Sequence, residues 1–273
     1  MQRLFIREKT EEKFVSAIEK QKIGVAGMSR GAGATFIATS LAKILSYRDD
    51  RKVTFLEVCD LTGNKSSLTY DSIGIDKRFK TREFVRFYNE IKSGGSIRGK
   101  TNPDDRINWG LITPEDVKAG AGLITPEDVK AGAGLTPIEM IRLINNISGD
   151  LIICDISECR NAEDYLLDMD YVIFVIDPVP SAMIKGYPFM REVKRIEYRG
   201  KKVIWVINKY NSGINKRDMQ SFLKLKEYYR IPLMDAGHFY SAEYNCKIPF
   251  EVATIQDGVR ETMEKIIKEL VLC

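Results

Sequence analysis

The chain has 273 residues, of which 44% are hydrophobic, and 42 basic against 38 acidic residues give it a formal net charge of +4. This is an ordinary globular composition, long enough for a sizeable core, and the mild basic excess does not by itself indicate nucleic acid or anionic lipid as a partner. The single histidine, His238, argues against histidine-based metal clusters and catalytic triads.

The five cysteines form no C-x-x-C pair. An odd number of scattered cysteines predicts reduced thiols in a cytoplasmic protein rather than a disulfide frame or a zinc site. The N-terminal stretch MQRLFIREKTEEKF is too charged for a signal peptide, and no apolar run approaches the ~20 residues that span a bilayer. Residues 1–21 are expected to be an N-terminal extension, with a charged helix packed against the sheet, although this helix could instead mediate assembly.

A strand, a loop of small residues and a helix follow one another at the start of the main domain. Ile23 to Ala26 are apolar, residues 27–34 are mostly small, and a helical pattern starts at Thr35. This order predicts a phosphate cradle, because loop N–H groups converge and the helix N-terminus adds about half a positive charge. The Thr35 hydroxyl is placed to reach a phosphate-bound Mg²⁺.

The cradle lacks the lysine of the G-x-x-x-x-G-K-[ST] pattern, since Ala34 precedes the threonine. Two other interpretations stay open. The glycines could begin a helix and bind nothing. Gly31 and Gly33 also fit the first half of a dinucleotide fingerprint, with Glu57 near the ribose-binding distance, but the third glycine would fall on Phe36, which is too large for close helix–strand packing.

Strand and helix patterns alternate along the rest of the chain. Apolar strands are expected at 53–58, 151–154, 171–176, 203–207 and 230–234, and helices at 137–147, 185–197 and 259–272. Runs this apolar belong to strands covered on both faces. Residues 22–273 are therefore predicted to form one three-layer α/β domain, with a twisted, mostly parallel sheet and helices on both faces.

Polar residues follow several of these strands, where open α/β sheets bind their ligands. Asp60 follows the second strand, and the pair Asn208-Lys209 follows the strand at 203–207. Asp155 follows the strand at 151–154 and has the form of a Walker B aspartate, which holds Mg²⁺ near the loop threonine. Each of these residues could also simply cap a turn.

Together the loop and the strand ends resemble the ParA/MinD family of deviant P-loop ATPases, whose loop reads approximately K-G-G-x-G-K-[ST]. Gly31, Gly33 and Thr35 match this pattern. The signature lysine of the family falls on Ser29, its second lysine falls on Ala34, and Arg30 stands where the family has glycine.

The resemblance implies ATP or ADP with Mg²⁺, with Thr35 and Asp155 at the metal. Asn208 and Lys209 would contact the adenine, and Asp60 would orient the attacking water. The resemblance also implies that nucleotide-binding residues fill the loop: Ser29, Arg30, Gly31, Ala32, Gly33, Ala34, Thr35 and Phe36.

By the same resemblance, the protein would form a dimer and act as a positioning or scaffold factor for a bacterial intracellular assembly, such as a plasmid, a division site, or pilus or secretion machinery. A charge-assisted hydrogen bond contributes about 1.5–3 kcal/mol of net stabilisation. Each increase of about 1.4 kcal/mol in the activation barrier slows a reaction about tenfold. Loss of both lysines should therefore weaken nucleotide binding and nearly abolish hydrolysis. The alternatives are an active ATPase in which Arg30 replaces the lysines, and a pseudo-ATPase interaction module without nucleotide.

Residues 111–122 (LITPEDVKAGAG) recur unchanged at 123–134. Their Gly-Ala-Gly ends and Thr-Pro-Glu-Asp helix starts predict an exposed loop insertion near 93–135, with a helical turn in each copy.

Residues 81–91 are expected to be helical. Their aromatics beside Arg82 and Arg86 make nucleic acid a possible partner, although core packing is favoured. Membrane binding by the last helix is not favoured, because its polar face mixes acidic and basic residues.

Overall fold

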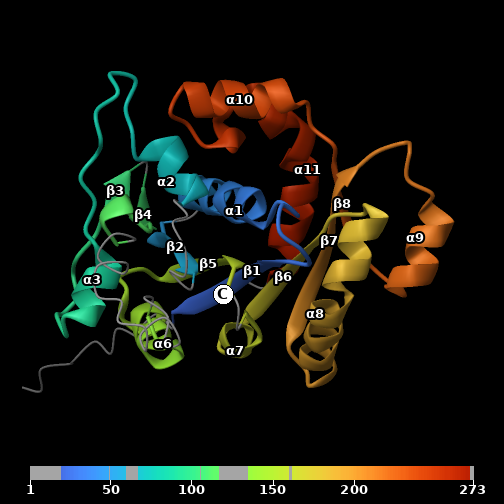
Figure 1. The fold of residues 1–273 in the computed structure, drawn as a ribbon, viewed down its shortest axis with the longest axis horizontal. Helices are drawn as coiled ribbons and strands as arrows, with labels where there is room; N and C mark the ends of the chain where they lie inside the picture. Colours follow the sequence, from blue (N-terminus) through green and yellow to red (C-terminus); the bar gives the residue numbers. More distant parts are fainter. Residues whose placement is uncertain are drawn as a thin grey trace, which may run out of the picture.

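In the computed structural model, the described residues form one α/β domain around an eight-stranded sheet of order β3-β4-β2-β5-β1-β6-β7-β8 (Figure 1). All neighbouring strands pair in parallel except β3 and β4. The predicted fold is therefore confirmed. The structure describes residues 20–48, 50–59, 67–104, 106–116, 135–159 and 162–270.

The strands are β1 (Gln21–Gly27), β2 (Val53–Cys59), β3 (Pro103–Asp104), β4 (Ile107–Gly110), β5 (Leu151–Glu158), β6 (Tyr171–Ile176), β7 (Lys202–Tyr210) and β8 (Tyr229–Pro232). The helices are α1 (Ala34–Arg48), α2 (Leu68–Ile73), α3 (Phe87–Lys92), α6 (Pro137–Asn146), α7 (Ala162–Leu167), α8 (Pro180–Tyr198), α9 (Lys216–Leu223), α10 (Ala236–Tyr244) and α11 (Ala253–Glu269), with a 3₁₀ turn η1 (Pro249–Glu251).

Helices cover both faces of the sheet. In Figure 1, α1, α2, α10 and α11 lie on one face, and α3, α6, α7 and α8 on the other. Successive strand residues serve the two faces alternately: Ile153 packs into the core under α1 and α11, whereas Ile152 and Cys154 pack into the opposite core. This alternation explains why the central strands read as continuous apolar runs.

The prediction of a helix over 81–91 is wrong in its bounds, because the helix in the structure runs over Phe87–Lys92. Before it, the backbone is held by a side chain: Asn102 accepts a hydrogen bond from the Val85 N–H (2.6 Å) and donates one to the Val85 carbonyl (3.1 Å). Phe87 and Tyr88 are fully buried, so the core role favoured for these aromatics is confirmed.

Part of the segment expected to be an exposed insertion belongs to the sheet. Residues 107–110 form β4 and pair with β2, and the side chain of Trp109 in this strand is only 2% exposed. In the first copy of the duplicated segment, Thr113 and Asp116 bond each other's backbone N–H groups, as the predicted helix start requires. Residues 117–134, and residues 1–19 of the expected N-terminal extension, lie outside the described residues.

The C-terminal part contains two helices that the sequence did not predict, α9 and α10. Residues 236–244 form α10, where a loop was expected. The last helix, α11, buries Val259, Met263 and Ile266 in the core, which confirms that its apolar face packs inward. Within the described ranges, no helix combines the length and the apolar character needed to cross a bilayer.

Candidate functional site

The loop between β1 and α1 depends on two glycines. Gly31 has φ +75° and Gly33 has φ +94°, both in the left-handed region that favours glycine. A Cβ on Gly33 would lie 2.1 Å from Nδ2 of Asn208, so this position also needs glycine for space. The loop is anchored at its start, where the Met28 N–H donates to the Val175 carbonyl at 2.7 Å.

Asn208 and Lys209, near the end of β7, hold this loop from the side. Nδ2 of the buried Asn208 donates to the Ala32 carbonyl at 2.8 Å. Nζ of Lys209 donates to the Gly31 carbonyl at 2.6 Å and pairs with the Asp177 carboxylate at 2.7 Å. An adenine contact through the Asn208 amide nitrogen would compete with its bond to the loop, so that contact stays a prediction.

A cavity of about 320 Å³ opens against the loop. Oγ of Ser29 is buried on this cavity and has no hydrogen-bond partner within the described ranges. The first N–H groups of α1 also face outward from the helix without intrahelical acceptors. An anion in the cavity would supply the missing acceptors, so the residues present fit a phosphate group. Other walls come from α2, β5 and α10, through Leu68, Ser72, Ser157, Phe239 and Glu243.

Thr35 and Asp155, the residues predicted at the metal, lie close to Ser157. Oγ1 of Thr35 lies 3.2 Å from Oγ of Ser157, whose N–H donates to the Asp155 carboxylate at 3.1 Å. In the part of the chain that the structure describes, no group of three His, Cys, Asp or Glu side chains could hold a metal ion. Mg²⁺ here would therefore need phosphate and water oxygens beside Thr35 and Asp155, which is its usual mode of binding.

The strand predicted over 151–154, with Asp155 directly after it, is longer in the structure: β5 contains Asp155 and continues to Glu158. Its neighbours β1 and β2 pair with it, so Val25 and Glu57 stand in register on either side of Asp155. Because side chains alternate along a strand, Asp155 and Ser157 point to the same face. That period-two spacing is the sequence signal that could have found Ser157.

Glu57 is a buried residue on β2, in register with Asp155. It accepts hydrogen bonds from the Ser67 hydroxyl and from the Ile112 N–H, the latter at 2.9 Å. Burial raises the pKa of Glu57 to about 7, and the nearby Asp155 carboxylate acts in the same direction. A carboxyl engaged in this way cannot bind a ribose, so the dinucleotide alternative loses its acidic residue.

The structure thus brings together the predicted loop, Asp155, Asn208 and Lys209. Arg30 is exposed at the loop, and Phe36 packs against Phe239 with ring centroids 5.3 Å apart. Asp60 lies outside the described residues. Sequence reasoning missed Asp177 as well as Ser157, although an acidic residue directly after an apolar strand carries the same signal as Asp155.

The sequence matches no family model and none of the curated proteins with significance. Solved structures with a similar fold include a ParA family ATPase from Chlorobium tepidum TLS (15% identity, TM-score 0.61). The alignment with it covers 92% of this chain and 99% of the ATPase. A protein described as a plasmid partition protein from Borrelia burgdorferi B31, bound to AMPPNP, has 16% identity and a TM-score of 0.63 over 93% of this chain and 100% of that one. The septum site-determining protein MinD from Pyrococcus horikoshii OT3, complexed with Mg-ADP, has 16% identity and a TM-score of 0.60 over 93% and 96%. The structural similarity shows that the chain has the ParA/MinD fold, and at 15–16% sequence identity it shows the fold alone.

Proposed function

We propose that this chain, which has the fold of the ParA and MinD ATPases, binds ATP or ADP with Mg²⁺ at the loop before α1. It forms a dimer and acts as a positioning or scaffold factor for a bacterial intracellular assembly. The observation that carries the proposal is the loop itself: Gly31 and Gly33 shape it, Asn208 fixes it, and Ser29, whose buried hydroxyl has no partner within the described ranges, lines the cavity beside it. Nucleotides bound to the Borrelia and Pyrococcus proteins support the choice of ligand.

Hydrolysis is expected to be weak or absent. Ser29 and Ala34 supply no charge where a phosphate would bind, and the Lys209 ammonium is already paired with Asp177 and the Gly31 carbonyl. Arg30 is exposed on the loop, and the stabilisation of a transferring phosphate would fall to its guanidinium. Any turnover should therefore depend on Arg30.

Restoring the loop lysine tests the cradle. Ala34 is among the residues that line the cavity, and it stands where the family pattern has its second lysine, so a lysine here is expected to extend towards a bound phosphate. Ala34→Lys should tighten Mg·ATP binding roughly tenfold or more, because a charge-assisted hydrogen bond contributes about 1.5–3 kcal/mol. Isothermal titration calorimetry measures the change.

The control is Ala34→Met, which has similar length and no charge, and which should give no gain in affinity. If lysine and methionine have the same effect, the cradle does not hold phosphate. The chain would then be a pseudo-ATPase that acts through protein contacts alone.

A further inference from the structure

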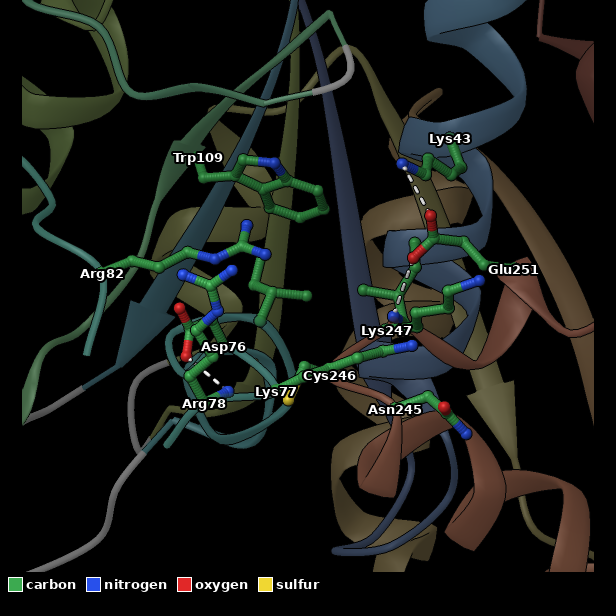
Figure 2. Close-up of a pocket in the computed structure, with 12 residues that line it drawn as sticks. Lys43, Asp76, Lys77, Arg78, Arg82, Trp109, Asn245, Cys246, Lys247 and Glu251 are labelled. Atoms are coloured by element: carbon green, nitrogen blue, oxygen red, sulfur yellow. Dashed lines mark hydrogen bonds and ion pairs between the residues drawn. The ribbon is translucent and has the colours of Figure 1, made fainter. Parts of the chain in front are cut away.

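A second cavity, of about 410 Å³, lies on the other side of Ile248 from the loop cavity. Its walls come from the middle of α1, from β4, from the turn at 76–82 and from the segment 245–251 that follows α10. Figure 2 shows Trp109 and Arg82 on one side of this cavity, and Lys43 joined to Glu251 on the other. We call it the basic cavity. Apart from Ile248, it shares none of its described lining residues with the loop cavity.

Positive charge dominates this lining. Five basic side chains and two carboxylates line it: Lys43, Lys77, Arg78, Arg82 and Lys247, with Asp76 and Glu251. Both carboxylates are engaged within the fold. Asp76 accepts the backbone N–H groups of Arg78 (2.8 Å) and Lys80 (3.0 Å), which closes the turn. Glu251 pairs with Lys43 at 3.2 Å and accepts the Ile248 N–H at 3.0 Å.

The side chains of Lys77 and Lys247 have no hydrogen-bond or ion-pair partner among the residues that the structure describes. They come from two segments far apart in the sequence, the turn after α2 and the segment after α10. Because the carboxylates are occupied, the excess positive charge is available to a ligand that enters the cavity.

Trp109 forms one wall of the basic cavity. It is 2% exposed, it lines the basic cavity, and its Nε1–H has no acceptor within the described ranges. A buried indole N–H normally finds an acceptor. The Phe55 ring, with its centroid 5.3 Å away, packs against the indole. The indole ring thus forms part of the cavity wall, and a ligand that enters the cavity would change its surroundings.

We propose that the basic cavity binds the phosphate group of a small anionic ligand. The guanidinium groups of its arginines and the ammonium groups of its lysines are the donors that phosphate oxygens commonly accept from proteins. The volume falls within the range of small-molecule sites. A duplex would instead contact an extended surface. This site is separate from the nucleotide site proposed above and does not depend on it.

The test titrates inorganic pyrophosphate and follows tryptophan fluorescence. The chain has two tryptophans, and Trp205 packs on the opposite face of the sheet from Trp109, so the emission change reports on Trp109. Titrations on a Gly33→Ala background remove binding at the loop. On this background the pyrophosphate signal should persist, and Arg82→Gln should weaken it at least tenfold. Arg191→Gln, an exposed arginine of α8 outside the cavity, should leave it unchanged.

Lys77→Gln, on the exposed turn, is the second test variant if Arg82→Gln fails to fold, and it should also weaken the signal. AMP serves as a second probe and distinguishes a nucleotide from free phosphate as the source of the bound group. The proposal is overturned if pyrophosphate and AMP leave the emission unchanged. It is also overturned if the variants bind like the Arg191→Gln control, or if only duplex DNA shows a dependence on Arg82 and Lys77.

Discussion

Replacing Gly33 by alanine should abolish measurable ATP binding while the domain still folds. The residue has φ +94°, and a Cβ there would lie 2.1 Å from Nδ2 of Asn208. The contact can be relieved only by moving the loop or by breaking the hydrogen bond from Asn208 to Ala32. Either change displaces the N–H groups that would surround a phosphate. Calorimetry with Mg·ATP measures the loss, which we expect to exceed tenfold.

Gly31→Ala is the matched control for this experiment. Gly31 also has a positive φ, +75°, but a Cβ there would meet nothing within 4 Å. Alanine should therefore destabilise the protein by about 1–2 kcal/mol through its backbone conformation and keep most of the ATP affinity. Equal ATP affinities in the two variants would mean that the loop and Asn208 do not form the binding site.

Replacing Glu57 by glutamine should remove a large part of the pH dependence of stability. Burial holds the pKa of this carboxyl at about 7, against an ordinary value of 4.5. Below pH 4.5 it is protonated in both the folded and the unfolded chain. Between the two values the folded chain binds more protons, so stability falls as pH rises, and the full loss is reached above pH 7. A pKa difference of about 2.5 corresponds to about 3 kcal/mol.

Urea unfolding at pH 4.5 and pH 8 checks this expectation. Relative to wild type, Glu57→Gln should be more stable at pH 8 than at pH 4.5 by about 3 kcal/mol. Glutamine keeps an oxygen that accepts the Ile112 N–H, and its amide N–H can donate to the Ser67 hydroxyl oxygen. Glu163→Gln, at an exposed position, should retain the wild-type pH profile. An unchanged profile in Glu57→Gln would show that Glu57 ionises normally in the folded protein.

Much of the fold could be predicted because its strands are buried on both faces. Such strands produce long apolar runs, and Tyr171–Ile176 was predicted at its observed bounds. The loop was predictable for a different reason: left-handed backbone at Gly31 and Gly33 requires glycine, so the sequence itself records the turn. Asn208 could be found from its place after an apolar run.

The rest could not be predicted because it depends on contacts between distant segments. β4 is too short for a pattern and exists because β2 offers it an edge. Residues 81–86 have helical spacing, but Asn102 holds their backbone in another conformation. The hydrogen bonds of Glu57 come from Ser67 and from Ile112, and Ile112 is 55 residues away in the sequence. Local propensity yields to such tertiary contacts.

If the loop before α1 holds a triphosphate, as we claim, increasing Mg·ATP should shift the thermal unfolding of the wild-type protein. Binding at about 100 times Kd should stabilise the folded state by about 2.7 kcal/mol and raise Tm by several degrees. Gly33→Ala should show no rise. A wild-type Tm that stays constant up to millimolar Mg·ATP, or a rise of the same size in Gly33→Ala, would contradict the claim.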